Sequence, residues 1–220
     1  MSDPMDFLLL TKGPLFVIAI TIAVLGLAAR ILEILIIGRR PNYSEARAGE
    51  WLPGLRTVIT RTVADPGTFK RAPFDVVVGW LWHLGFLCAL LLFIPHIELI
   101  KSLIGLSWTG LPNPVVDLIT AVTLVALVAT LVHRRTHPVK RHISTIEDYL
   151  VWAVVFLVVL TGYLAYHRLI NPYPLALGLH ILCAEVFLIV LPFTKLTHIF
   201  TAFIARWYNG ASFGRRGVES

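Results

Sequence analysis

The stretch that decides the fold is residues 179–204, LHILCAEVFLIVLPFTKLTHIFTAFI, an apolar segment with a histidine near each end. These histidines, His180 and His198, are 18 residues apart, which is five whole turns of an ideal α-helix. Both imidazoles are therefore expected on one face, about 27 Å apart along the axis. That separation is close to the hydrocarbon thickness of a bilayer, about 30 Å. The pattern predicts a membrane-spanning helix that holds a group at each of two depths.

The composition of the whole chain indicates an integral membrane protein. Of its 220 residues, 57% are hydrophobic and 15% are charged, and the mean hydropathy is +0.78. A soluble domain of this size could not bury so much apolar surface in one core. The first apolar run begins only after Asp3, Asp6 and Lys12 and is too long for a secretory signal. We therefore expect it to remain in the mature protein.

The apolar runs predict an all-α integral membrane fold, a bundle of five transmembrane helices forming a single membrane domain over residues 1–220. The connection at 39–73 is basic, and within it residues 55–63 can form a short amphipathic helix. This helix would lie at the membrane interface or form a docking surface. Arg30 and Glu33, three residues apart near the end of the first span, are expected to pair. The expected spans are about 14–38, 74–98, 115–132, 149–166 and 178–204.

The distribution of basic residues predicts the orientation. Fourteen of the 19 lysines and arginines fall on one side of the expected spans. The positive-inside rule then places the N-terminus outside and the C-terminus in the cytoplasm. We therefore expect a multi-pass protein of a bacterial or archaeal cytoplasmic (inner) membrane.

Four histidines form two antiparallel pairs in this topology. The second span runs outward and the fifth inward, so His83 is expected to meet His198 near the cytoplasm, and His96 to meet His180 near the outside. Neutral imidazoles on opposite faces of a porphyrin, in an apolar slot, are the ligands of a b-type haem. The sequence thus predicts two haem b groups, the inner held by His83 and His198 and the outer by His96 and His180. Since the chain has no CxxCH, neither haem should be covalently attached.

The second span presents a geometric difficulty. His83 and His96 are 13 residues apart and cannot share one face of an ideal helix. Pro95 is expected to disrupt the helix and turn the residue that follows it. The axial rise between His83 and His96 is smaller than that between His180 and His198. Helix tilt, or a break at Pro192, must make up the difference. His167, at the end of the fourth span, is the alternative fourth ligand.

Two motifs resemble the gamma subunit of respiratory nitrate reductase and its relatives in hydrogenase and heterodisulfide-reductase-like complexes. The resemblance covers all five spans in order, and these two carry its specific part. They are Trp82-His83-Leu84-Gly85 and the interval from His180 to Leu191-Pro192-Phe193-Thr194-Lys195-Leu196-Thr197-His198-Ile199.

The resemblance implies a di-haem cytochrome b with an outward N-terminus. Such a subunit moves electrons between the quinone pool and an iron–sulfur subunit on the cytoplasmic side. The match places His83 and His198 at the haem nearer that partner and His180 at the distal haem. The chain departs from the family at the fourth ligand, where Phe93 stands ten residues after His83, and His96 takes its place. The catalytic partner is therefore not necessarily a nitrate reductase.

The expected partners are a cytoplasmic iron–sulfur protein with its catalytic subunit, membrane lipid and a quinone, and not nucleic acid. A quinone site needs a group near a haem edge that exchanges protons. The candidates toward the outer side are Glu98, Lys101, Asp117 and Glu185. The alternative function is a haem-free membrane anchor, or a small transporter of protons or metal ions that uses its buried histidines.

Overall fold

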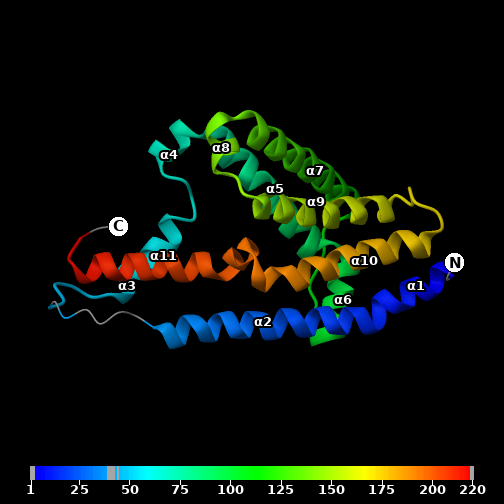
Figure 1. Cartoon of the computed structure of the whole chain (residues 1–220), viewed down its shortest axis with the longest axis horizontal. Helices are drawn as coiled ribbons and strands as arrows, with labels where there is room; N and C mark the ends of the chain where they lie inside the picture. The colour runs from blue at the N-terminus through cyan, green and yellow to red at the C-terminus, as the bar shows by residue number, and fades with distance from the viewer. Residues whose placement is uncertain (1–2, 39–42, 44, 219–220) are drawn as a thin grey trace. The chain divides into compact units, whose positions relative to one another are not determined.

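The structure is a computed structural model that describes residues 3–38, 43 and 45–218. Throughout these ranges the regular structure is helical, and no strand occurs in them (Figure 1). Five helices are long and apolar enough to cross a membrane, which confirms the prediction of an all-helical, multi-pass protein. They are Pro4–Ile37, Pro73–Leu92, Asn113–Thr136, Ile146–Tyr166 and Tyr173–Phe193.

The chain divides into two compact units, where the composition predicts a single domain. The first unit comprises Met1–Ile20 and Pro73–Leu188, and the second comprises Thr21–Ala72 and Ile189–Ser220. Residues 39–42 and 44 of the expected basic loop, Arg39 and Arg40 among them, lie outside the described residues.

The first unit begins with a helix that changes its hydrogen-bonding pattern at a proline. Asp3 caps this helix by accepting a hydrogen bond from the Met5 amide at 3.0 Å. Pro14 lies in a π-helical turn, where its missing N–H interrupts the α-helical ladder. The segments are α1 (Pro4–Leu10), the π turn η1 (Thr11–Leu15) and α2 (Phe16–Ile37), whose later residues belong to the second unit.

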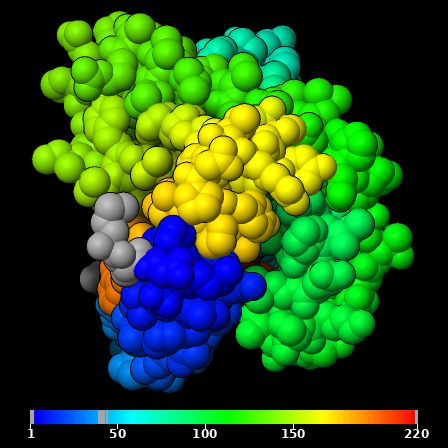
Figure 2. Space-filling view, turned by 90° about the vertical axis from the view of Figure 1, so that its right-hand side faces the viewer, coloured from blue at the N-terminus to red at the C-terminus, as the bar shows by residue number. Residues whose placement is uncertain are grey.

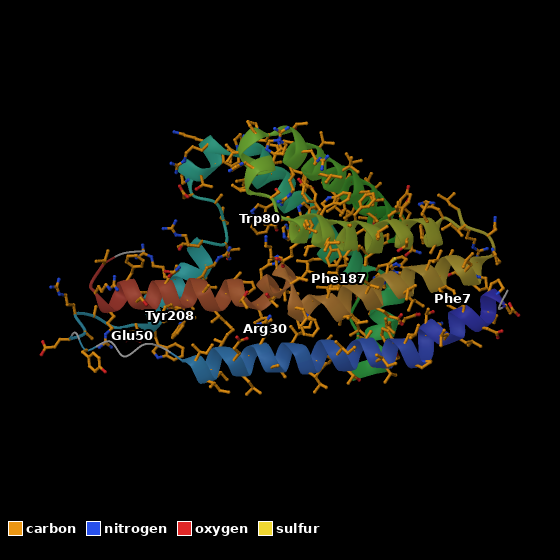
Figure 3. All side chains as sticks on the ribbon, in the orientation of Figure 1. Phe7, Arg30, Glu50, Trp80, Phe187 and Tyr208 are labelled. Carbon is orange, nitrogen blue, oxygen red and sulfur yellow. The ribbon has the colours of Figure 1, made fainter. Side chains whose placement is uncertain are left out.

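Five further α-helices and a short one complete the first unit. They are α5 (Pro73–Leu92), α6 (Ile94–Ile104), α7 (Asn113–Thr136), α8 (Pro138–Ile143), α9 (Ile146–Tyr166) and α10 (Tyr173–Val190). Helix α7 contacts both α5 and α9 (Figure 1). The indole of Trp152 on α9 donates a hydrogen bond to the Leu127 carbonyl of α7 at 2.8 Å. On α10, Phe187 contacts Phe86 of α5 at 5.7 Å between ring centroids (Figure 3).

The start of α10 packs closely on the first helix. A Cβ atom on Gly178 would lie only 2.7 Å from the ring of Phe7, so the two backbones approach closely because this residue has no side chain. Figure 2 shows the N-terminal residues (blue) against the chain around the start of α10 (yellow). This contact fixes one face of α10 toward the first helix.

The second span ends earlier than the expected 74–98. Helix α5 stops at Leu92, Phe93 is extended (φ −82°, ψ 126°), and α6 starts immediately afterwards with Pro95 in its first turn. The prediction that Pro95 interrupts this helix is therefore confirmed. His96 lies on a separate helix from His83.

The loop after α6 supplies hydrogen-bond donors to the backbone carbonyls that are left without one at the break. In a continuous helix the Leu91 carbonyl would accept from residue 95, but proline has no N–H. The indole of Trp108 donates to that carbonyl instead, at 2.6 Å. The amide of Leu111 donates to the next carbonyl, that of Leu92, at 2.9 Å. The loop after α6 thus stabilises the break.

The continuous helix expected over 178–204 is wrong, and the break at Pro192, one of the two adjustments that the sequence offered, is present. Helix α10 ends at Val190, two 3₁₀ turns follow, and Thr194 between them is fully extended (φ −126°, ψ −179°). Pro192 cannot donate a helical hydrogen bond, and its own carbonyl accepts one from the Arg30 side chain at 3.0 Å. The five-turn argument that put His180 and His198 on one face therefore does not hold in the folded chain.

The second unit is built on the pairing of an early helix with the helix that follows this break. Its segments are the rest of α2, then α3 (Trp51–Thr60), α4 (Pro66–Arg71), the 3₁₀ turns η2 (Leu191–Phe193) and η3 (Lys195–Thr197), and α11 (His198–Arg215). Helix α3 confirms the short helix predicted at 55–63, with earlier bounds. It packs on α11 through glycines, since a Cβ on Gly54 would lie 2.6 Å from the Trp207 indole nitrogen.

Ion pairs and a cap hold the ends of these segments. Glu50 and Arg215 join the start of α3 to the end of α11 at 2.9 Å (Glu50 is labelled in Figure 3). The predicted pair of Arg30 with Glu33 is present at 2.8 Å. Asp65 caps α4, and the hydrogen bond from the Thr68 side chain lowers the pKa of its carboxyl.

A glycine substitution tests the packing of α5 on α7. A Cβ atom on Gly85 would collide with the hydroxyl of Thr123, which is buried and donates to the Ile119 carbonyl at 2.7 Å. We expect Gly85→Ala to lower the free energy of unfolding by about 1–3 kcal/mol, because overpacking forces the neighbours apart. Gly79→Ala is the matched control on the same helix, since its Cβ would meet nothing within 4 Å. Equal thermal stability of the two variants in detergent would contradict this packing.

Candidate bis-histidine site

His180 lies on the face of α10 that packs on α9. A Cβ atom on Gly162 of α9 would lie 3.0 Å from Cε1 and 3.2 Å from Nδ1 of the His180 ring. The ring therefore occupies space that exists because residue 162 has no side chain. The Thr161 hydroxyl lies 3.4 Å from His180 Nδ1. These contacts set the Cε1–Nδ1 edge of the ring against α9, and Nε2 lies 3.5 Å from the same Cβ position.

His96 is held on α6 by the break in the second span. Its Nδ1 lies 2.8 Å from the Ala89 carbonyl oxygen, in the last turn of α5. A carbonyl only accepts hydrogen bonds, so this contact assigns the ring proton to Nδ1 and the lone pair to Nε2. A backbone carbonyl on Nδ1 is the usual support of a metal-binding imidazole. Without the turn at Phe93, the ring would not reach back to α5.

The structure brings His96 and His180 together. Their ring centroids are 6.0 Å apart and their planes differ by 28°. Two imidazole–metal bonds of about 2 Å, with about 1.1 Å from each nitrogen to its ring centre, require a separation of roughly 6 Å. The spacing and the Nδ1 contacts therefore fit the predicted axial ligands of one haem.

The other two predicted ligands show the same orientation of the imidazole. His83 Nδ1 lies 2.7 Å from the Gly79 carbonyl, and His198 Nδ1 lies 2.7 Å from the Lys195 carbonyl. The His83 ring also stacks on Trp82 at 3.5 Å between centroids. His83 belongs to the first unit and His198 to the second, so the inner pair stays a prediction.

His167, the alternative fourth ligand, is engaged elsewhere. Its Nε2 lies 2.7 Å from Oδ1 of Asp117, and its ring contacts Tyr163 and Tyr166 at 4.4 and 5.1 Å between centroids. The structure thus places His96 opposite His180, with His167 paired to a carboxylate. Sequence reasoning missed this pair, although the start of the third span and the end of the fourth were expected at the same membrane boundary.

The four quinone-site candidates do not form one cluster. Glu98 and Lys101 are exposed on α6, and Asp117 is bonded to His167. Glu185 is 2% exposed, and neither carboxylate oxygen has a hydrogen-bond partner among the described residues. It lies seven residues after Gly178, so it shares the face of α10 that packs on the first helix. Asp117 is the candidate that the structure joins to another titratable group.

Comparison with known proteins gives one relative. No family model and no solved structure matches the sequence. The chain is 33% identical over 152 residues to a protein of Nitratidesulfovibrio vulgaris (strain Hildenborough), whose name, "Protein", states no activity. The match covers 68% of this chain and 66% of that protein, so the chain spans just under two thirds of its relative's length. The comparisons therefore show a chain similar to this bacterial protein over most of its length, and they name no activity for either.

Proposed function

We propose that the chain is a haem b membrane subunit that transfers electrons between the quinone pool and a cytoplasmic iron–sulfur oxidoreductase. The observation that carries the proposal is the His96–His180 pair, with centroids 6.0 Å apart and His96 Nδ1 bonded to a backbone carbonyl. A bound haem would supply one-electron redox chemistry at each of two depths. His83 and His198 would hold the second group.

The protein's own part is to orient the ligands and to exclude water. Gly162 makes room for the His180 ring, and the Ala89 carbonyl fixes the tautomer of His96. Two of the helices at the site, α9 and α10, are apolar enough to cross a membrane, and apolar surroundings tune a haem potential. These features support electron transfer rather than a purely structural role for the histidines.

The ligand count disfavours a metal transporter. A metal ion without a porphyrin usually takes three or four protein ligands. Over the described residues, no group of three or more His, Cys, Asp and Glu side chains could hold a metal ion. A porphyrin supplies four nitrogens itself and needs two axial ligands. The two-histidine site therefore favours haem over the alternative of a metal transporter.

The proposed orientation has the N-terminus outside and the C-terminus in the cytoplasm, in a bacterial or archaeal inner membrane. It rests on the 14 of 19 basic residues that fall on one side. In the second unit these include Arg56, Arg61 and Arg206. Such a surface favours an iron–sulfur partner with acidic patches, since complementary charge steers docking.

A quinol-driven reduction tests the proposed function. Duroquinol added to the purified, air-oxidised protein should produce the absorbance bands of a reduced bis-histidine cytochrome b within the mixing time of a stopped-flow instrument. Dithionite serves as the control that reduces any haem present. A haem that dithionite reduces and duroquinol does not would contradict a role in quinol chemistry.

A further inference from the structure

We propose that the Asp117–His167 pair is the proton acceptor of a quinol-oxidising site beside the outer haem. This inference rests on the proposed function and goes beyond it by naming the residues that take the quinol protons. Its support is the hydrogen bond between the two side chains, their place at a membrane boundary, and the ring contacts that join them to His96.

The pair has the arrangement of a carboxylate that supports a general base. Asp117 Oδ1 lies 2.7 Å from His167 Nε2, so the imidazole N–H donates to the carboxylate. This bond orients the ring, assigns the proton to Nε2, and leaves Nδ1 to accept a proton. When Nδ1 is protonated, the carboxylate stabilises the imidazolium. The arrangement therefore suits repeated uptake and release of protons.

Both residues lie where a quinol headgroup would meet the membrane boundary. Asp117 is in the second turn of α7, and His167 caps the C-terminus of α9. Their side chains are 31% and 33% exposed, so a ligand and water can reach them. In the proposed orientation this is the outer face, toward which the protons would be released.

Aromatic rings connect the pair to the site of the outer haem. His167 contacts Tyr166 at 5.1 Å, Tyr166 contacts Phe93 at 5.7 Å, and Phe93 contacts His96 at 5.4 Å, each between ring centroids. All of these residues belong to the first unit. The break after α5 places Phe93 between the pair and His96. Flat aromatic surfaces of this kind commonly line the sites of planar ligands.

Oxidation of one quinol releases two protons and two electrons. A quinol O–H bond breaks as an N–H bond forms at His167 Nδ1, and the imidazolium passes that proton to water outside. The second hydroxyl proton takes the same route after the first has left. A haem held by His96 and His180 would accept the two electrons one at a time, and the quinol would leave as a quinone.

The other titratable groups around His167 serve this role less well. Tyr163 and Tyr166 of α9 contact its ring, but a phenol is a poor base near neutral pH. From α6, His96 is assigned to the haem. Arg168, the next residue, lies over the ring of Tyr173 at 5.5 Å. An imidazole bonded to a carboxylate is the base best matched to proton transfer at neutral pH.

Variants of the pair in the full-length protein test the inference. His167→Gln and Asp117→Asn should each retain the haem content of the wild type. Their rate of haem reduction at saturating duroquinol should fall about a hundredfold or more, because the positioned base is lost. The half-saturating duroquinol concentration, and the binding of duroquinone measured by isothermal titration, should change by less than about threefold. His142→Gln, an exposed histidine on α8, is the matched control and should react as the wild type does.

Chemical rescue separates proton transfer from a structural role. External imidazole should restore much of the lost rate to His167→Ala and none to Asp117→Ala. Unchanged duroquinol kinetics in both His167→Gln and Asp117→Asn would overturn the inference while leaving the proposed function intact. A wild-type protein that binds no haem would overturn both, and the haem assay on that protein tells the two failures apart.

Discussion

Replacing His180 with alanine should remove one of two haems and abolish the reaction with quinol. The His180 ring fills the space beside Gly162 and faces His96 at 6.0 Å, so its loss takes away one axial bond of that haem. His96→Ala should have the same effect, because both residues would hold one iron in the proposed site. The haem content measured as the pyridine haemochrome should fall from two per chain to one in either variant.

His167→Ala is the matched control for these two variants. It removes an imidazole from the same part of the first unit, but one whose Nε2 is bonded to Asp117. It should keep both haems. Loss of a haem from His167→Ala, together with full haem content in His96→Ala, would show that the fourth ligand had been assigned to the wrong histidine.

Replacing His83 with alanine should remove the other haem and stop electron exchange with the cytoplasmic partner. In the proposed topology His83 and His198 hold the only relay near the inner surface, so no second route exists. The outer haem should survive, because sites farther apart than about 10 Å without shared partners usually respond separately. The spectrum of His83→Ala should therefore retain one haem that duroquinol still reduces.

The His198→Ala variant checks the pairing across the two units. It should lose the same haem as His83→Ala, and the double variant should lose no more than either single one. Two different haems lost from the single variants, or none lost from one of them, would contradict the inner pair. Redox titration of the remaining haem in each variant identifies which one is missing.

The sequence predicted the number of spans because each apolar run is long and bounded by polar residues. It also predicted the break in the second span, since Pro95 has no N–H to donate. It could not predict that Trp108 and Leu111 would satisfy the carbonyls left behind. Those partners come from a loop whose path depends on tertiary packing rather than on local pattern.

The fifth span shows where periodicity is misleading. The 18-residue spacing of His180 and His198 suggested one straight helix, yet the chain is extended at Thr194. An apolar run indicates how long a helix can be but not which hydrogen bonds its backbone makes. Here the Arg30 side chain donates a hydrogen bond to the Pro192 carbonyl. The pairing of His180 with His96 depends on α6 and α9, so it does not need the straight helix.

The Asp117–His167 pair was missed for a related reason. The two residues are 50 positions apart, and each had a simpler local explanation at its own helix end. Only the packing of α7 on α9 brings the two ends together. Matching polar residues by expected membrane depth would have suggested the pair, but not its 2.7 Å hydrogen bond.

The most direct test of the central claim is the haem content of the purified, full-length protein. The protein should contain two haem b per chain by the pyridine haemochrome assay, both extractable by acidified acetone because the chain has no CxxCH. Its reduced-minus-oxidised spectrum should show the bands of a bis-histidine cytochrome b. Protein with correct helical content that holds less than one haem per chain after expression with ample haem would contradict the account.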